Sequence, residues 1–273
     1  MTQLVAPLGT GESTTADPTI ALRLSGVSKS FGGVKVLREV DMQVRAGTVH
    51  FLIGPNGAGK TTLFNIITGY TPCDGGEVEV LGSRATGLSA RRLAHRGMAR
   101  TFQNLQLFES LTVAENVLVS LHKDMKGGLG RALLGVVGGP ENRAYTEAYE
   151  WLDRFGLAHY AGSRPSDLSY GDRRLVEVVR ALATRPRLLL LDEPAAGLGV
   201  EARANLLEVL RGLRSSDLTI VLIEHDMRFG MSLADDVTVL DVGTRIAHGT
   251  PREVQADPRV VDAYLGRRGA TDD

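Results

Sequence analysis

The chain has 273 residues, enough for one large domain or two small ones, and its 31 basic and 32 acidic residues give a formal net charge of −1. With so little net charge, it has no overall field that would draw it onto a nucleic acid or an anionic bilayer. A single cysteine, Cys73, excludes an internal disulfide and a multi-cysteine metal site, and is typical of a reducing compartment, where we expect a small or indifferent thiol.

The first 19 residues are rich in Thr, Gly, Ser and Pro without apolar periodicity, which predicts a disordered leader. The first basic residue is Arg23, so no basic region precedes an apolar one and the amino end does not resemble a secretory signal. No stretch approaches the roughly 18 consecutive apolar residues that a membrane-spanning helix requires. We therefore expect a cytoplasmic chain that does not itself cross a bilayer.

Four short β-prone runs follow the leader. They cover 20–24, 40–44, 49–53 and 77–81. Between about 89 and 183 an apolar period of about 3.6 residues takes over, so the middle third is predicted to be mainly helical. Near-continuous apolar runs, typical of buried parallel strands, return at 188–191, 220–223 and 237–240.

This order predicts an α/β core that is interrupted by a helical insert. The core is assigned to 20–90 and 184–248, and the insert to 91–183, with a glycine-rich loop at 127–139. A helical tail at 249–266 and a disordered end at 267–273 complete the predicted organisation.

A glycine-rich segment joins the strand predicted at 49–53 to a helix predicted at 61–68. It matches the pattern G-x-x-x-x-G-K-[ST] and consists of Gly54, Pro55, Asn56, Gly57, Ala58, Gly59, Lys60 and Thr61, with Thr62 next. In such a loop, backbone N–H groups converge on phosphate oxygens, and the helix presents its partly positive amino end to the same anion. We expect Lys60 to reach the β and γ phosphates and Thr61 to bind Mg²⁺.

Two acids, Asp192 and Glu193, follow the apolar run at 188–191. The carboxyl ends of strands are where α/β sheets bind ligands, so we assign Asp192 to the Mg²⁺ shell. Glu193 would orient and deprotonate the water that attacks the γ phosphate, a role worth about 10² to 10⁴ in rate. Acids after a strand usually form turns, but the phosphate loop favours the functional interpretation here.

A second anion site is predicted where an amphipathic helix begins. Ser169 has the features of an N-cap residue. Ser169 and Gly171 also bring a hydroxyl, backbone N–H groups and the helix dipole together at one helix end. The chain would then carry two phosphate-binding half-sites.

In their order along the chain these motifs resemble the ATP-binding cassette (ABC) family, over about residues 20 to 266. The resemblance implies an α/β fold: a P-loop NTPase (RecA-like) core with an antiparallel β subdomain and an inserted α-helical signature subdomain. It adds Gln103 as a catalytic residue and metal ligand, and His225 as the switch histidine beside the γ phosphate. It also places Phe31 against adenine, for which a core phenylalanine is the alternative.

The chain departs from the family pattern at two places. Tyr170 and Asp172 replace the first glycine and the glutamine of the signature Leu-Ser-Gly-Gly-Gln, and Gly199 replaces the aspartate of Ser-Ala-Leu-Asp. These departures, the segment 100–104 and the tail at 249–266 are similar to the ATPase subunits of branched-chain amino acid importers. The long insert around 122–146 resembles the larger of the two such subunits.

The resemblance implies an ATPase, producing ADP and phosphate, that powers uptake of branched-chain or hydrophobic amino acids through a separate membrane permease. A related urea or amide importer, a lipopolysaccharide exporter and, less favoured, a non-transport ABC ATPase are the alternatives. The implied cofactors are ATP and Mg²⁺. At the level of the complex, the implied partners are a second ATPase subunit, permease subunits and a periplasmic or extracellular substrate-binding protein, with no nucleic acid. The chain would then lie at the inner face of the cell membrane.

Two cassettes would dimerise head to tail, with each ATP between 54–61 of one chain and 169–171 of the other. We expect 104–111 to form the coupling surface for a permease helix, with its apolar residues divided between that surface and the core. These residues are Leu105, Leu107, Phe108 and Leu111. For the nearby basic run, a solvated helix face is favoured over contact with a partner or lipid. This run comprises Arg91, Arg92, Arg96 and Arg100.

Overall fold

The computed structural model describes residues 19–121, 140–213 and 217–265. The predicted leader up to residue 18, the glycine-rich loop at 127–139 and the end at 267–273 lie outside these residues. Within them, no helix is both long enough and apolar enough to span a membrane.

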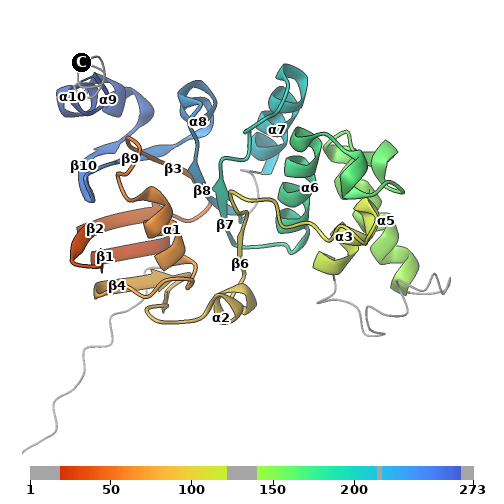
Figure 1. Cartoon of the computed structure of the whole chain (residues 1–273), viewed down its shortest axis with the longest axis horizontal. Helices are drawn as coiled ribbons and strands as arrows, with labels where there is room; N and C mark the ends of the chain where they lie inside the picture. The colour runs from red at the N-terminus through yellow and green to blue at the C-terminus, as the bar shows by residue number, and fades with distance from the viewer. Residues whose placement is uncertain (1–18, 122–139, 214–216, 266–273) are drawn as a thin grey trace, which may run out of the picture.

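A six-stranded sheet, in the order β10-β9-β3-β8-β7-β6, forms the centre of the molecule (Figure 1). All neighbouring pairs are parallel except β9 and β10, which are antiparallel. Its strands are β3 (Val49–Ile53), β6 (Met98–Arg100), β7 (Leu188–Asp192), β8 (Thr219–Ile223), β9 (Asp236–Asp241) and β10 (Thr244–Gly249). Every residue of β3, β7 and β8 is buried, which explains why their sequences are continuous apolar runs.

A second, antiparallel sheet has the order β2-β1-β4-β5 and confirms the predicted β subdomain. Its strands are β1 (Ile20–Phe31), β2 (Val34–Arg45), β4 (Gly75–Val80) and β5 (Ser83–Arg84). The runs predicted at 20–24 and 40–44 are therefore too short. Gly32 and Gly33, with φ of 55° and 85°, make a two-residue hairpin turn that lets both strands continue to it.

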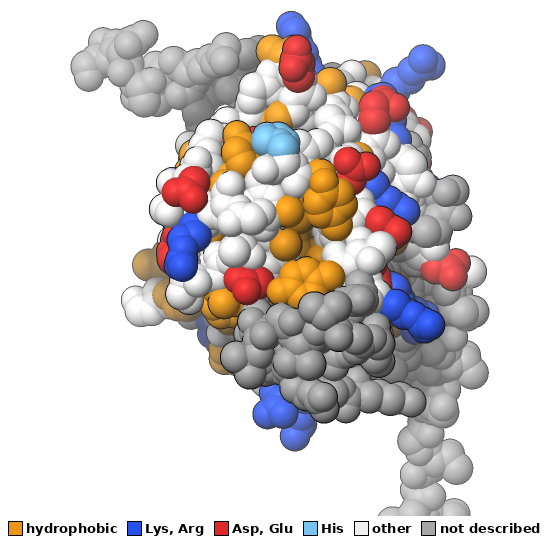
Figure 2. All heavy atoms as spheres, turned by 90° about the vertical axis from the view of Figure 1, so that its right-hand side faces the viewer, with side chains coloured by type: hydrophobic (Ala, Val, Ile, Leu, Met, Phe, Trp, Pro, Cys, Tyr) orange, Lys and Arg blue, Asp and Glu red, His pale blue; other side chains and the backbone are white. Residues whose placement is uncertain are grey.

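Helices cover the sheets and form the right-hand end of Figure 1. They are α1 (Lys60–Ile67), α2 (Ala90–His95), α3 (Val113–Ser120), α5 (Pro140–Arg154), α6 (Tyr170–Ala183), α7 (Val200–Gly212), α8 (Met227–Leu233), α9 (Pro251–Ala256) and α10 (Pro258–Leu265), with short 3₁₀ turns η2 (Ala158–Tyr160) and η3 (Pro165–Asp167). Figure 2 looks onto the end formed by α3, α5 and α6, where acidic and basic side chains surround a smaller group of apolar ones.

The prediction of a helical insert from residue 91 is wrong at its start. Met98–Arg100 forms β6, which pairs in parallel with β7 at the edge of the central sheet. Its sequence Met-Ala-Arg has no apolar run, so only pairing with β7 makes it a strand. The helical part of the insert therefore begins after β6, with α3.

Alternate residues of the central strands pack into two different cores. Leu189 and Leu191 of β7 lie in the core formed with α3, α5 and α6. Leu188 and Leu190 lie in the core formed with α1 and the antiparallel sheet. Because the sheet is covered on both faces, the carboxyl ends of its strands are held in fixed positions at one edge. Cys73 is half-buried beside the second core.

Candidate active site

The glycine-rich loop joins β3 to α1, as predicted, and is pressed against neighbouring strands. Gly57 and Gly59 have φ of 80° and 99°, a region that favours glycine. A Cβ at Gly54 would lie 2.1 Å from the main-chain oxygen of Leu240, and one at Gly59 would lie 2.7 Å from Leu37 Cδ2. Gly59 is the N-cap of α1 and makes no side-chain capping bond, so the amino end of this helix has no side-chain cap.

Lys60 is buried at the start of α1 with its ammonium group folded over the loop. Its Nζ donates hydrogen bonds to the main-chain oxygens of Gly54, at 2.6 Å, and Pro55, at 3.0 Å. Burial lowers the pKa of Lys60, and the nearby carboxylates of Glu193 and Asp192 oppose that shift. The positive charge is therefore held between the loop and the two acids.

A pocket of about 270 Å³ brings together segments that are far apart in the sequence. Its lining combines most of the loop with Gln103 from the segment after β6, Glu193 from the end of β7 and His225 from the end of β8. The complete lining is Val36, Asn56, Gly57, Ala58, Gly59, Lys60, Thr61, Thr62, Gln103, Glu193, Ile223 and His225. The four predicted catalytic residues thus face one cavity.

Glu193 and His225 are in direct contact, with 3.0 Å between Glu193 Oε1 and His225 Nε2. Glu193 has φ of 52°, and a left-handed backbone at a residue other than glycine costs about 1 to 2 kcal/mol. Its N–H donates to the Ile223 oxygen at 2.9 Å, and its own oxygen accepts from Arg174 Nε at 3.2 Å. Both main-chain groups of Glu193 are therefore bonded, which holds the carboxylate in place.

Glu224, which the sequence prediction missed, fixes the segment that carries His225. Its buried carboxylate accepts from the main-chain N–H of Ala195 at 2.7 Å and from that of His225 at 3.0 Å. Burial raises its pKa, and these N–H groups oppose the shift. The turn after β7 and the turn after β8 are thus joined through one side chain.

Asp192 lies behind the pocket, where it pairs with Arg100. Arg100 Nη2 is 3.2 Å from Asp192 Oδ2, and the two side chains are only 6% and 3% exposed. Burial raises the pKa of Asp192, and Arg100 opposes that shift. The interpretation of Arg100 as part of a solvated face is wrong, because β6 carries it into the core, whereas Arg91, Arg92 and Arg96 are exposed.

The donors near the pocket fit a magnesium ion that arrives with phosphates. Among the described residues, no group of three or more His, Cys, Asp or Glu side chains could hold a metal ion alone. Thr61, Gln103 and Asp192 offer oxygen donors with a single carboxylate. Mg²⁺ prefers oxygen ligands and is usually bound by one or two carboxylates together with substrate phosphates.

The signature segment has the predicted helix cap, and Tyr170, one of its departures from the family pattern, packs against a glycine. Ser169 Oγ accepts from the N–H of Asp172 at 3.1 Å and donates to its carboxylate at 2.7 Å. Tyr170 lies over Gly197, where a Cβ would be 2.7 Å from the tyrosine ring, and a Cβ at Gly171 would be 2.8 Å from the Gly197 oxygen. A side chain at position 197 would therefore have to displace the Tyr170 ring.

The predicted nucleotide-contacting residues do not all meet within one chain. Ser169 and Gly171 do not line the pocket of the glycine-rich loop. Phe31 does not line it either, and it is 50% exposed, so the alternative of a core phenylalanine is wrong. Lys29 Nζ lies 5.2 Å from the centre of its ring. Phe31 and Ser169 are exposed, whereas Gly171 is buried against the loop that carries Gly197.

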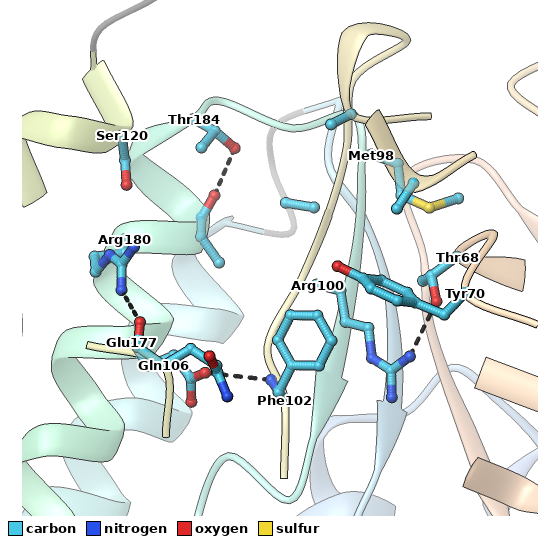
Figure 3. A pocket seen from close by; sticks show the side chains of 14 residues that line it. Thr68, Tyr70, Met98, Arg100, Phe102, Gln106, Ser120, Glu177, Arg180 and Thr184 are labelled. Carbon is cyan, nitrogen blue, oxygen red and sulfur yellow. Dashed lines mark hydrogen bonds between the residues drawn. The ribbon is translucent and has the colours of Figure 1, made fainter. Parts of the chain in front are cut away.

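A second cavity, of about 300 Å³, lies between the sheet and the helical part (Figure 3). Glu177 and Arg180 of α6 form one wall, and Thr68, Tyr70 and Arg100 form the other. Its lining is Thr68, Tyr70, Ala90, Ala94, Met98, Ala99, Arg100, Phe102, Gln106, Ser120, Glu177, Arg180, Ala181 and Thr184. We call this cavity the helix–sheet groove.

The apolar residues of 104–111 divide between core and surface. Leu107 packs against the main core, and Leu105 and Leu111 are half-buried. Phe108 is exposed, and the Arg180 guanidinium lies 5.0 Å from the centre of its ring. Phe108 is therefore the member of this set that is free to contact another molecule.

Comparisons with known proteins match nearly the whole chain. A family model described as ABC transporter matches residues 37–196, and one described as Branched-chain amino acid ATP-binding cassette transporter matches residues 244–270. The chain is 41% identical over 248 residues to the high-affinity branched-chain amino acid transport ATP-binding protein LivG of Salmonella typhimurium, covering 90% of this chain and 97% of that protein. It is 39% identical over 251 residues to BraF of Pseudomonas aeruginosa, with the same two coverages.

Solved structures of ATP-binding cassettes are also similar to this chain. One is the ADP conformation of an ATP-binding cassette of an ABC transporter, with a TM-score of 0.77, 32% identity and coverage of 90% of this chain and 99% of that one. Another is the dimeric structure of a bacterial ABC transporter cassette, with a TM-score of 0.74, 26% identity and coverage of 85% and 99%.

Proposed function

Because this chain belongs to the ABC transporter family, as an ATPase cassette, we propose that it powers the import of branched-chain or other hydrophobic amino acids through a separate permease. The observation that carries the ATPase part of the proposal is the 3.0 Å contact between Glu193 and His225 inside the pocket of the glycine-rich loop, and the transport part is supported by the similarity to LivG and BraF. This contact supports the assignment of Glu193 as a base and of His225 as a second polar group beside the γ phosphate.

ATP binds with its phosphates on the loop. Main-chain N–H groups of the loop between Asn56 and Thr62 bind the phosphate oxygens. Lys60 gives up its contacts with the Gly54 and Pro55 oxygens and binds the β and γ phosphates instead. Phe31 stacks on adenine from the exposed end of β1. Thr61, Gln103 and Asp192 would hold a Mg²⁺ ion that arrives with ATP, and the ion would supply positive charge to the phosphates.

Glu193 acts as general base on the attacking water. Its carboxylate enters the pocket from the end of β7 and is in contact with His225, to which we assign the contact with the γ phosphate. The water's proton passes to Glu193 while its oxygen attacks phosphorus, and the bond to the β-phosphate oxygen breaks to leave ADP. Gln103, which lines the same pocket, helps to orient the water.

A second cassette completes the site. Ser169 and Gly171 do not line the pocket of their own chain, and Ser169 is exposed at the start of α6, so we assign this helix end to the nucleotide of a partner cassette. A dimeric solved structure of a similar cassette supports this arrangement. ATP is then bound between two chains, and its hydrolysis removes the γ phosphate that holds them together.

The helix–sheet groove receives a cytoplasmic helix of the permease. The groove is continuous with the segment that carries Gln103, since Phe102 and Gln106 both line it. The exposed ring of Phe108 extends the apolar surface at its edge. Relatives named as transport ATP-binding proteins support a membrane partner of this kind, which would hold the chain at the inner face of the membrane.

Two experiments test this function. Lys60→Met should abolish phosphate release from Mg-ATP by the purified chain, whereas Lys35→Met, on the exposed part of β2, should leave it unchanged. Equal phosphate release by the two variants would overturn the assignment of the pocket. Affinity purification from detergent-solubilised membranes should recover integral membrane subunits, and recovery of a soluble complex alone would refute the transport role.

A further inference from the structure

Arg174 is a buried cation that the proposed reaction does not use. It lies in the second turn of α6, and it is the largest of the fully buried side chains in the described part of the chain. A guanidinium group is costly to bury unless its N–H groups are bonded. The hydrogen-bond partners of Arg174 therefore indicate which segments this side chain fixes in place.

Three of its partners are main-chain oxygens from two segments of the active site. Nε donates to Glu193 at 3.2 Å, and Nη2 donates to Asp192 at 3.1 Å. Nη1 donates to Phe102, the residue before Gln103. A single side chain thus joins α6 to the end of β7 and to the segment that carries Gln103.

Glu177, one turn further along α6, completes the arrangement. Its Oε2 accepts from Arg174 Nη1 at 2.9 Å, and its Oε1 accepts from the Phe102 N–H at 3.3 Å. Figure 3 shows Glu177 reaching across to Phe102 at the base of the helix–sheet groove. Both main-chain groups of Phe102 are therefore held by side chains of α6.

The contact with Glu193 matters because the backbone there is strained. Glu193 has φ of 52°, and Arg174 bonds the oxygen of that residue while Ile223 bonds its N–H. A left-handed residue other than glycine persists only where its surroundings fix it. The planar guanidinium reaches several acceptors in set directions, which a lysine ammonium does not.

We propose that Arg174 is a positioning residue for ATP hydrolysis, which fixes the Glu193 carboxylate and Gln103 relative to α6 and thus to the signature segment at the start of that helix. The inference rests on the proposed role of Glu193 as base. Arg174 does not line the nucleotide pocket, so its loss displaces the reacting groups without removing a nucleotide contact.

The experiment compares Arg174→Lys and Arg174→Met with Arg211→Lys in the full-length chain. Arg211 pairs with Glu208 on the surface of α7 and serves as the matched control. Displacing catalytic groups by about 1 Å can cost roughly 10²-fold in rate. We expect kcat per ATP-binding site to fall at least about tenfold in Arg174→Lys and further in Arg174→Met, with the Kd for ATP and the kcat of Arg211→Lys each within about twofold of the parent.

If Arg174 contributed only to the stability of the fold, its variants would yield less folded protein, but kcat for each site that binds ATP would be unchanged. That result in Arg174→Lys would overturn the inference, as would a parallel loss of ATP affinity. If Arg174→Met does not fold, Glu177→Gln takes its place in the comparison with Arg174→Lys. Glu177→Gln keeps the size of the side chain at position 177 and weakens its hydrogen bond to the Phe102 N–H. It should lower kcat in the same direction, and parental turnover in both variants would refute the inference.

Glu193→Gln separates this inference from the proposed function. If Glu193→Gln turns over ATP at the parental rate, the base assignment fails. If it is inactive while Arg174→Lys keeps the parental kcat, only the positioning role of Arg174 fails.

Discussion

Replacing Arg100 with methionine tests how much this arginine stabilises the buried carboxyl group of the metal-ligand candidate Asp192. Arg100 Nη2 lies 3.2 Å from Asp192, and Arg100 Nη1 donates to Asn65 at 2.7 Å and to Thr68 at 3.0 Å. Methionine fills most of the same volume but offers no donor. The substitution therefore leaves a buried carboxylate without its cation.

The expected cost follows from the burial of the pair. With the two side chains only 6% and 3% exposed, breaking the pair by removing one partner should cost about 3 to 5 kcal/mol. For a chain of this size, each kcal/mol lowers Tm by about 2 to 4 °C. We therefore expect Tm to fall by roughly 6 to 20 °C.

The assay is thermal and urea unfolding of the parent and of two variants. Arg211→Met is the matched control, because Arg211 pairs with Glu208 at 2.9 Å but the two side chains are 41% and 70% exposed. An exposed pair is worth about 0 to 1 kcal/mol. Adding Asp192→Asn to Arg100→Met should recover part of the loss, since the buried charge is then removed.

The reasoning fails if Arg100→Met costs no more than Arg211→Met. It also fails if Asp192→Asn adds its full cost on top of Arg100→Met, because the two side chains would then not be coupled.

Three further predictions concern stability. Gly197→Ala should cost about 1 to 3 kcal/mol, because φ there is 75° and the new Cβ would lie 2.7 Å from the Tyr170 ring; an unchanged urea midpoint would contradict this. Gly199→Asp should stabilise the chain by a few tenths of a kcal/mol, about 1 °C in Tm, since Gly199 is an uncapped N-cap with open space around it; a lower Tm would refute it. Burial and His248 lower the pKa of His50 to about 3, so the unfolded chain binds this proton first as pH falls. Stability should therefore decline between pH 6.5 and about 3 by up to about 1.4 kcal/mol per pH unit more in the parent than in His50→Gln, and parallel urea-unfolding curves for the two across this range would exclude the effect.

Sequence patterns predicted the parts of the fold that depend on residues close together along the chain. Strands β3, β7 and β8 are buried on both faces, so each is an apolar run and its position was predicted to within a residue. The glycine-rich loop was recognised because the spacing of its glycines, lysine and threonine is the one that a phosphate-binding loop requires. Strand β6 was missed, because its three residues become a strand only through pairing with β7.

The charged residues of the core were missed for a related reason. Arg100, Arg174 and Glu177 stand at positions that, in the sequence, are equally consistent with a solvated helix face. What buries them is contact with β7 and with Phe102, which are close in space but distant along the chain. Contacts between residues distant along the chain cannot be read from the sequence, whereas all but two of the residues that line the pocket were found through their motifs. The exceptions are Val36 and Ile223.

Phosphate release by Glu193→Gln tests the central claim most directly. The variant keeps the size of the side chain and its place at the end of β7, but it removes the proposed base. With Mg-ATP bound at parental affinity, we predict that turnover falls by about 10² to 10⁴, whereas Glu208→Gln on the surface of α7 retains the parental rate. Parental turnover by Glu193→Gln with ATP fully bound would contradict the account.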